Sequence, residues 1–121
     1  LGMQHRCLML RSNWCSNIAG TFDVVLSNPP YIPTAEIAAL DADVQGFEPH
    51  TALDGGADGL DGYRAIIHQL APHVKAGALV LFEVGQGQAA DVAALGNAAG
   101  WTCKEIANDL AGIARVVAFE I

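Results

Sequence analysis

The feature that most constrains the fold is a change of hydrophobic period between residues 58 and 99. Apolar residues recur at helical spacing over 58–74, fill a short run at 78–84 that only Glu83 interrupts, and return to helical spacing at 88–99. A short apolar run between two helical segments is typical of a buried strand with helices packed on its sheet. The chain is therefore expected to form an α/β layer with a mostly parallel sheet.

The first helical segment has one apolar face, made of Tyr63, Ile66, Ile67, Leu70, Ala71 and Val74. These residues follow the i, i+3, i+4 spacing of a helix that packs on a core. Asp58 is expected to cap its first turn, and Gly77 to separate the helix from the strand at 78–84. The helix over 88–99 is expected to stop at Gly100.

Three further strands are expected around this unit, with a fourth at the beginning of the chain. Residues 22–27 form an apolar run that stops at Asn28-Pro29-Pro30, as a buried parallel strand does. Residues 101–106 and 114–121 are expected to be the last strands, and a short strand is also expected over 6–10. This pattern predicts one domain, which suits a chain of 121 residues.

Residues 32–57 are expected to be a long loop, because they contain Pro33, Pro49 and several small residues. One helical turn is expected near 35–40. Long loops in compact domains are usually functional, so this segment is a candidate lid, with Glu48 as a weak site candidate.

Composition narrows the classes of function. Six basic and thirteen acidic side chains give a net charge of −7, whereas duplex-binding domains carry a basic face, so nucleic acid is a disfavoured partner. The three cysteines form no CxxC pair, which is typical neither of a disulfide framework nor of a zinc site and favours a reducing cytoplasm. No apolar run approaches the ~20 residues that cross a bilayer, so no membrane partner is expected.

Other polar candidates have plain structural interpretations. Asp54, Asp58 and Asp61 lack the alternating spacing of a calcium loop and are expected to form a solvated turn with a helix cap. The four histidines show no metal-ligand spacing, so no metal site is expected. Glu83 ends a strand on the ligand side and is expected either to line a site or to serve a structural hydrogen bond.

The sequence Asn28-Pro29-Pro30-Tyr31 lies beyond the carboxyl end of a strand, where ligands bind in open α/β sheets. One interpretation is a rigid turn and nothing more, because the prolines stiffen the chain. In the chemical interpretation, the Asn28 side-chain carbonyl and a proline carbonyl accept both hydrogens of an NH₂ group, and Tyr31 stacks on its plane. Such a site suits transfer of an electrophilic group to a poorly nucleophilic nitrogen.

With its neighbours, this segment resembles the motif of S-adenosylmethionine-dependent amino-methyltransferases, and further matches narrow the resemblance to the HemK/PrmC family of release-factor glutamine methyltransferases. The matches run in family order at 22–32, 47–49 with 52–53, 58–64, 82–85 with Gln88, and 109–112 with 115–117. The resemblance implies a Rossmann-like class I methyltransferase fold, mostly parallel with an antiparallel last strand. It implies S-adenosylmethionine as cofactor and a release-factor glutamine as substrate.

The same resemblance implies the site residues. Asn28 would contact cofactor and substrate amide, Pro29 would hold the amide through its carbonyl, and Tyr31 would stack on it, with Pro30 completing the substrate site. This assigns the catalytic roles to Asn28, Pro29 and Tyr31.

The cofactor residues implied by the resemblance are Asn13, Trp14 and Asn28. Residues 11–14 match the family segment beside the cofactor's adenine, although Asn13 stands where the family has an acid. An amide still accepts a hydrogen bond from the adenine amino group. The turn at 85–87 is not the family's glycine-rich cofactor loop, because it follows a later strand.

The family's glycine-rich loop and ribose-binding acid precede the strand at which this chain begins. Residues 1–121 are therefore expected to be a partial catalytic domain, inactive alone, with the strand at 22–27 as an edge and residues 1–20 loosely packed. The alternative functions are glutamine methylation of a ribosomal protein, N6-methylation of adenine in DNA, and an inactive truncated fragment. DNA adenine N6-methyltransferases share the strand-end motif. They must extract the base from a duplex, however, which needs phosphate contacts, and the net charge of −7 disfavours such contacts.

Overall fold

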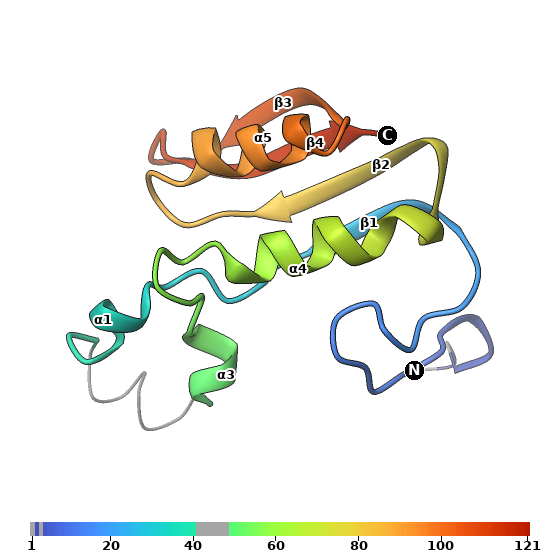
Figure 1. Ribbon diagram of the computed structural model, residues 1–121, viewed down its shortest axis with the longest axis horizontal. Helices are drawn as coiled ribbons and strands as arrows, with labels where there is room; N and C mark the ends of the chain where they lie inside the picture. The colour runs from blue at the N-terminus through green and yellow to red at the C-terminus, as the bar shows by residue number, and fades with distance from the viewer. Residues whose placement is uncertain (1, 3, 41–48) are drawn as a thin grey trace.

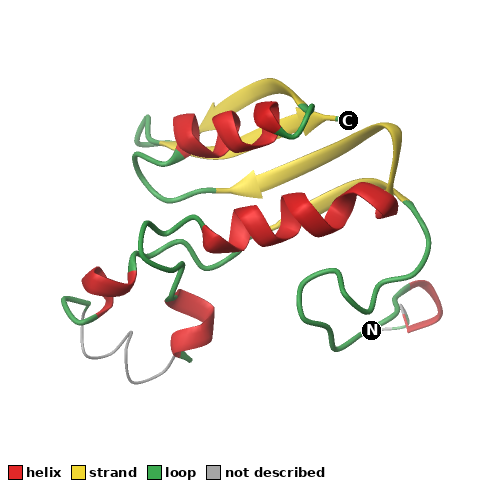
Figure 2. Cartoon of the chain, viewed as in Figure 1, coloured by secondary structure: helices red, strands yellow, loops and turns green. Residues whose placement is uncertain are grey.

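The structure is a computed structural model that describes residues 2, 4–40 and 49–121. The elements, in chain order, are η1 (Gln4–Arg6), β1 (Phe22–Ser27), α1 (Thr34–Ile37), α3 (His50–Leu53), α4 (Asp61–Leu70), η2 (Ala71–His73), β2 (Val74–Glu83), α5 (Ala89–Ala98), β3 (Thr102–Asn108) and β4 (Ala114–Glu120). Figure 1 shows α4 and α5 lying across one face of the sheet, with α1 and α3 together beyond the end of β1. Figure 2 shows the same arrangement by element type.

The sheet has four strands in the order β1-β2-β4-β3. β1 is parallel to β2, and β4 is antiparallel to both β2 and β3. β1, β2 and β3 therefore run in one direction and β4 in the other, which confirms a mostly parallel sheet with an antiparallel last strand. Because parallel strands end at a common edge, the residues after β1 and β2 come together there. The expectation that β1 is an edge strand of this sheet is also confirmed.

Alternation along β2 determines where the core lies. Val80 and Phe82 are fully buried, whereas Leu79, which precedes Val80, is 43% exposed and Leu81, which lies between the two, is partly exposed. The buried side faces α4 and α5, since Val80 and Phe82 share one apolar cluster with residues of both helices. On the opposite face, Val24 pairs with Leu79 and is also exposed. The helices therefore cover one face of the sheet, and apolar side chains are open to solvent on the other.

The core contains a cluster of four aromatic rings: Tyr63, Phe82, Trp101 and Phe119. Tyr63 meets Phe82 edge-on, with ring centroids 5.4 Å apart and an interplanar angle of 85°. The Tyr63 hydroxyl donates to the backbone oxygen of Glu83 at 2.8 Å. This bond ties the start of α4 to the carboxyl end of β2, which is the edge that carries the candidate site.

The prediction of a strand over residues 6–10 is wrong. The structure has the short helix η1 at Gln4–Arg6, followed by exposed residues without regular structure. A strand forms only beside a pairing partner, and no described strand lies beside this segment. The expected loose packing of 1–20 is wrong at Cys15, which is buried and whose N–H donates to the Gln69 side chain on α4 at 3.0 Å.

Several boundaries also differ. β2 begins at Val74, because Val74 pairs with Phe22 of β1, so Gly77 lies inside the strand, with φ +79°, rather than before it. The residue at the α4 N-cap position is Leu60, and the Asp58 carboxylate accepts the Leu60 N–H instead of capping the helix.

Ala71 is exposed, because the chain tightens into η2 there, and Val74 is half-buried in β2. The loop has a second helical turn, α3, besides the expected one at α1, and Phe47 and Glu48 lie outside the described residues. No helix in the described part of the chain is long and apolar enough to cross a membrane.

Candidate active site

The Asn28–Tyr31 turn follows β1 directly, at the common edge of the parallel strands. Pro29 is buried, Pro30 and Tyr31 are half-buried, and Asn28 is exposed. None of the described residues forms a hydrogen bond with the Asn28 side-chain amide. The turn therefore presents a free amide on a stiff, partly buried backbone.

Four glycines pack against this turn and form what we call the glycine cradle: Gly55, Gly59, Gly62 and Gly85. A Cβ at Gly62 would lie 2.8 Å from the Cβ of Pro29, and one at Gly55 would lie 2.8 Å from the Pro30 carbonyl oxygen. Both distances are shorter than packed atoms tolerate. Only glycine lets these segments approach the prolines so closely.

The other two glycines of the cradle contact Tyr31. A Cβ at Gly59 would lie 2.4 Å from the Tyr31 carbonyl oxygen, and one at Gly85 would lie 2.7 Å from its ring atom Cδ2. Gly59 also has φ +80°, a conformation that L side chains rarely adopt. The cradle therefore holds both the backbone and the ring of Tyr31.

A short backbone ladder joins the turn to the loop before α4. The Ile32 N–H donates to the Leu53 oxygen at 3.1 Å, and the Gly55 N–H donates to the Ile32 oxygen at 2.8 Å. The Asp54 carboxylate accepts the Thr34 hydroxyl at 2.6 Å, and this bond holds the pKa of Asp54 below its usual value. The Asp54 carboxylate is accessible to solvent, as expected for a turn, and in addition it joins two segments.

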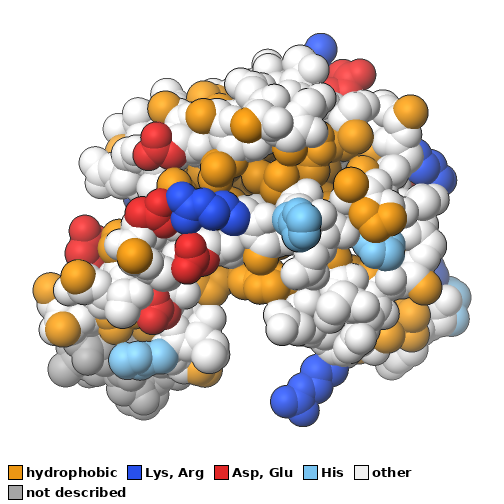
Figure 3. Space-filling model, in the orientation of Figure 1, with side chains coloured by type: hydrophobic (Ala, Val, Ile, Leu, Met, Phe, Trp, Pro, Cys, Tyr) orange, Lys and Arg blue, Asp and Glu red, His pale blue; other side chains and the backbone are white. Residues whose placement is uncertain are grey.

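Arg64 pairs with two carboxylates at the start of α4, Asp58 and Asp61. Its hydrogen bond lowers the pKa of Asp58 to about 2, and the same bond raises the pKa of Arg64. Figure 3 shows most of the acidic side chains visible in this view on the side that carries α1, α3 and the start of α4. No group of three or more His, Cys, Asp or Glu side chains within the described ranges is placed to hold a metal ion.

We expect the chain to lose stability as the pH falls from about 6 to about 2. The folded pKa values of Asp54, Asp58 and Asp109 are depressed; the main causes are hydrogen bonds from Thr34, from Arg64 and from a backbone N–H respectively. Their contribution is fully present above the unfolded pKa of about 3.9 and is lost as the pH falls through the folded value, about 2 for Asp58. Denaturant midpoints at the two pH values measure this loss.

Asp58→Asn is the variant for that experiment. It is expected to show a smaller fall in midpoint than the unsubstituted chain, because the most depressed of the three carboxyl groups is gone. Equal falls in the two proteins would show that Asp58 contributes nothing to the acid sensitivity.

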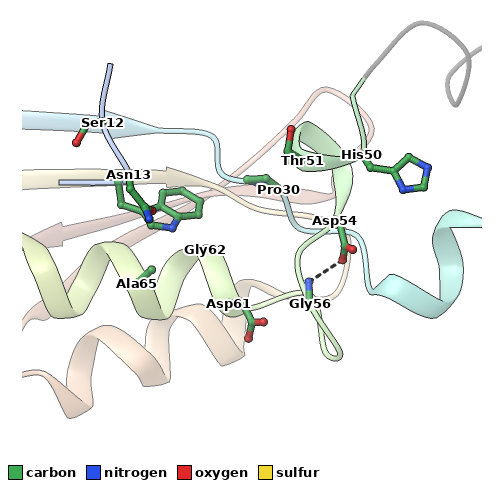
Figure 4. A pocket seen from close by; sticks show the side chains of 11 residues that line it. Ser12, Asn13, Pro30, His50, Thr51, Asp54, Gly56, Asp61, Gly62 and Ala65 are labelled. Atoms are coloured by element: carbon green, nitrogen blue, oxygen red, sulfur yellow. Dashed lines mark hydrogen bonds between the residues drawn. The ribbon is translucent and has the colours of Figure 1, made fainter. Parts of the chain in front are cut away.

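The largest hollow beside the turn has a volume of about 780 Å³ (Figure 4). Asn13, Trp14 and Pro30 line it together with residues of α3 and the start of α4. Trp14 has φ +54°, a strained conformation for a bulky residue, and its indole packs against Gly62. The structure therefore brings the two expected adenine-side residues to one wall of a hollow that also reaches Pro30.

The six expected site residues do not all line that hollow. Asn28 lines a smaller one of about 300 Å³ together with Glu83, and Tyr31 lines a third of about 390 Å³ together with Gln88. The three hollows border the same turn, because Asn28, Pro30 and Tyr31 each line a different one of them. A ligand that contacts Trp14 and Asn28 together must reach across the two prolines.

Two groups of residues around the site were not assigned to it from the sequence. Three glycines of the cradle had a visible signal, the density of glycine over 54–62, but they pack against residues 29–31, which are distant in sequence. His50 and Thr51 of α3 line the largest hollow and had no signal in spacing or motif.

The fold defines the class of protein. A crystal structure of a methyltransferase from Pyrococcus furiosus matches with a TM-score of 0.57, over 85% of this chain and 42% of that chain. The identity is 18%, so the likeness concerns the fold alone. The chain has the class I methyltransferase fold, as the resemblance implied.

Sequence similarity relates the chain to named methyltransferases. The release factor glutamine methyltransferase of Rhodospirillum rubrum is 47% identical over 115 residues, which cover 95% of this chain and 35% of the relative. Those of Bradyrhizobium diazoefficiens and Gloeobacter violaceus are 43% and 45% identical, over 97% and 96% of this chain and 40% and 41% of their own lengths. No family model matches. The chain is a homologue of the release factor glutamine methyltransferases and spans about two fifths of their length.

Proposed function

We propose that this chain forms part of the catalytic domain of an S-adenosylmethionine-dependent methyltransferase that modifies the side-chain nitrogen of a glutamine in a peptide chain release factor. The observation that carries the proposal is the Asn28–Tyr31 turn, held by the glycine cradle at the carboxyl edge of a methyltransferase-type sheet. The named function of relatives 43–47% identical to the chain supports the substrate class. Release factors work on cytoplasmic ribosomes, so the proposal also places the protein in the cytoplasm.

The chemistry of an amide explains why such a turn suits the reaction. An amide nitrogen is a poor nucleophile because its lone pair is delocalised into the carbonyl group. A site that accepts both N–H hydrogens fixes the plane of the amide and concentrates electron density on nitrogen. The Asn28 side-chain oxygen and the Pro29 carbonyl are the proposed acceptors, and the Tyr31 ring is the proposed wall for the amide plane.

The residues around the largest hollow fit an adenosine-type cofactor. Its volume of about 780 Å³ falls in the range of small-molecule sites, and an indole and an amide line one wall. Trp14 would stack on the adenine, Asn13 would accept from its amino group, and Asn28 would contact both cofactor and substrate. The bound cofactor supplies a methyl group on a positively charged sulfur. The chain's own residues orient the amide nitrogen toward that group, and the nitrogen then loses a proton to solvent.

A chimera tests the proposal, because the chain spans only 35% of the Rhodospirillum rubrum relative. Residues 1–121 replace the matching segment of that relative, and the intact relative is the control. The chimera is incubated with radiolabelled S-adenosylmethionine and, separately, with a release factor, ribosomal proteins and duplex DNA. We expect label on the release factor, and mass spectrometry should find one added methyl group on a glutamine side chain. Label on DNA adenine, or none where the intact relative labels the factor, would contradict the proposal.

A further inference from the structure

The side chain of Gln88 connects three segments of the site. Gln88 occupies the N-cap position of α5 and is half-buried. Its side-chain oxygen accepts the Gly85 N–H at 2.9 Å, and its Nε2 donates to the Tyr31 carbonyl oxygen at 2.8 Å. Nε2 also lies 3.5 Å from the Gly59 carbonyl oxygen. One amide therefore joins the loop after β2, the Asn28–Tyr31 turn and the loop before α4.

These bonds bear directly on the Tyr31 ring. The ring packs on Gly85, where a Cβ would lie 2.7 Å from Cδ2 and 3.0 Å from Cε2. Gln88 thus fixes the Tyr31 backbone through one end of its amide, and through the other end it fixes the glycine on which the ring rests. The start of α5 is a rigid base for both bonds, since the Val92 N–H donates to the backbone carbonyl oxygen of Gln88 at 3.0 Å.

We infer that Gln88 is a positioning residue for methyl transfer, acting through Tyr31. The inference rests on the proposed function, in which the Tyr31 ring is the wall for the substrate amide. Nε2 must donate for this role, so glutamate, which has the same shape, does not replace glutamine. A carboxylate at position 88 still accepts the Gly85 N–H but faces the carbonyl oxygens of Tyr31 and Gly59 without a hydrogen.

The first test follows the ring and needs no enzymatic activity. The chain has two tyrosines, so fluorotyrosine labelling gives two ¹⁹F NMR signals, which Tyr31→Phe assigns. In Gln88→Glu the Tyr31 signal is expected to shift while that of the buried Tyr63 stays in place. Gln86→Glu makes the same charge change at an exposed glutamine two residues away and is expected to move neither signal. If the Tyr63 signal shows that Gln88→Glu is unfolded, the experiment is repeated with Gln88→Met. This substitution removes both hydrogen bonds without adding charge.

The second test is kinetic and uses the chimera. Gln88→Glu is expected to lower kcat about tenfold and to change the KM for S-adenosylmethionine less than about twofold, because a misplaced wall disturbs orientation rather than cofactor binding. An unmoved Tyr31 signal, or a moved signal with an unchanged kcat, would overturn the inference. An unsubstituted chimera that methylates no glutamine would contradict the proposed function, and the Tyr31 signal alone would then decide whether Gln88 holds the ring.

Discussion

Replacing Asn28 with alanine is expected to lower the kcat of the chimera by about a hundredfold or more. The Asn28 amide is exposed, is not hydrogen-bonded to any described residue, and sits on a backbone held by two prolines and the glycine cradle. The backbone that carries the amide is therefore held in place before the substrate arrives, and the amide oxygen is free to accept a hydrogen bond from it. Loss of one such group from a transition state reduces rates by roughly 10²–10³. Single-turnover methylation of the release factor measures the effect on the chemical step.

Asn108→Ala is the matched control for this substitution. Asn108 is also an exposed asparagine at the end of a strand parallel to β1, but β3 is the strand farthest from β1 in the sheet. Asn108→Ala is expected to leave kcat within about twofold of the unsubstituted chimera. A near-normal turnover of Asn28→Ala, or an equal loss in both variants, would exclude the catalytic role of Asn28.

Replacing Gly59 with alanine is expected to destabilise the chain by about 2–5 kcal/mol. A residue other than glycine at φ +80° is strained by about 1–2 kcal/mol. The added methyl group would also lie 2.4 Å from the Tyr31 oxygen and 2.7 Å from Nε2 of Gln88, and overpacking of this kind costs about 1–3 kcal/mol more. Small domains are stable by only about 5–15 kcal/mol, so the effect is large.

The variant Gly77→Ala separates the backbone strain of a positive φ from the overpacking of an added methyl group. Gly77 has nearly the same φ, +79°, but a Cβ there would meet nothing within 4 Å. Gly77→Ala is therefore expected to destabilise the chain through backbone strain alone, by about 1–2 kcal/mol. Denaturant titrations of the two variants give the difference. Equal losses of stability would mean that the close approach of Gly59 to Tyr31 does not constrain the turn.

The elements that the sequence predicts well are those whose pattern is local. The helical spacing of Tyr63, Ile66, Ile67 and Leu70 predicts the buried face of α4, and all four are buried in the structure. The apolar run at 22–27 and the prolines after it predict β1 and its end. Both signals arise within a few residues of one element. The expectation that the strand over 22–27 is buried is wrong, because no residue of β1 is buried and β1 lies at the edge of the described sheet.

The errors concern features that depend on distant partners. The strand expected at 6–10 has the composition of a strand but no described neighbour to pair with. Gly77 is a helix terminator by local rules, yet pairing with β1 draws β2 back to Val74. The role of the glycines over 54–62 becomes visible only when the Asn28–Tyr31 turn lies against them.

The candidate site shows the same contrast between local sequence patterns and contacts with distant residues. Its residue types and their place after β1 are legible in the sequence, and the family resemblance is confirmed by relatives 43–47% identical. The division of five of the six residues among three hollows is not legible, because it depends on where each side chain points, and Pro29 lines none of the three. The bonds of Gln88 also join positions 29 and 57 residues apart.

The most direct test is a crystal structure of the chimera with S-adenosylhomocysteine and a release-factor peptide that contains the target glutamine. We expect the glutamine side-chain nitrogen to lie about 3 Å from both the Asn28 side-chain oxygen and the Pro29 carbonyl oxygen. The Tyr31 ring should stack on the amide plane, and the adenine should contact Trp14. A glutamine amide bound away from residues 28–31 would contradict the assignment of this turn as the methyl-acceptor site.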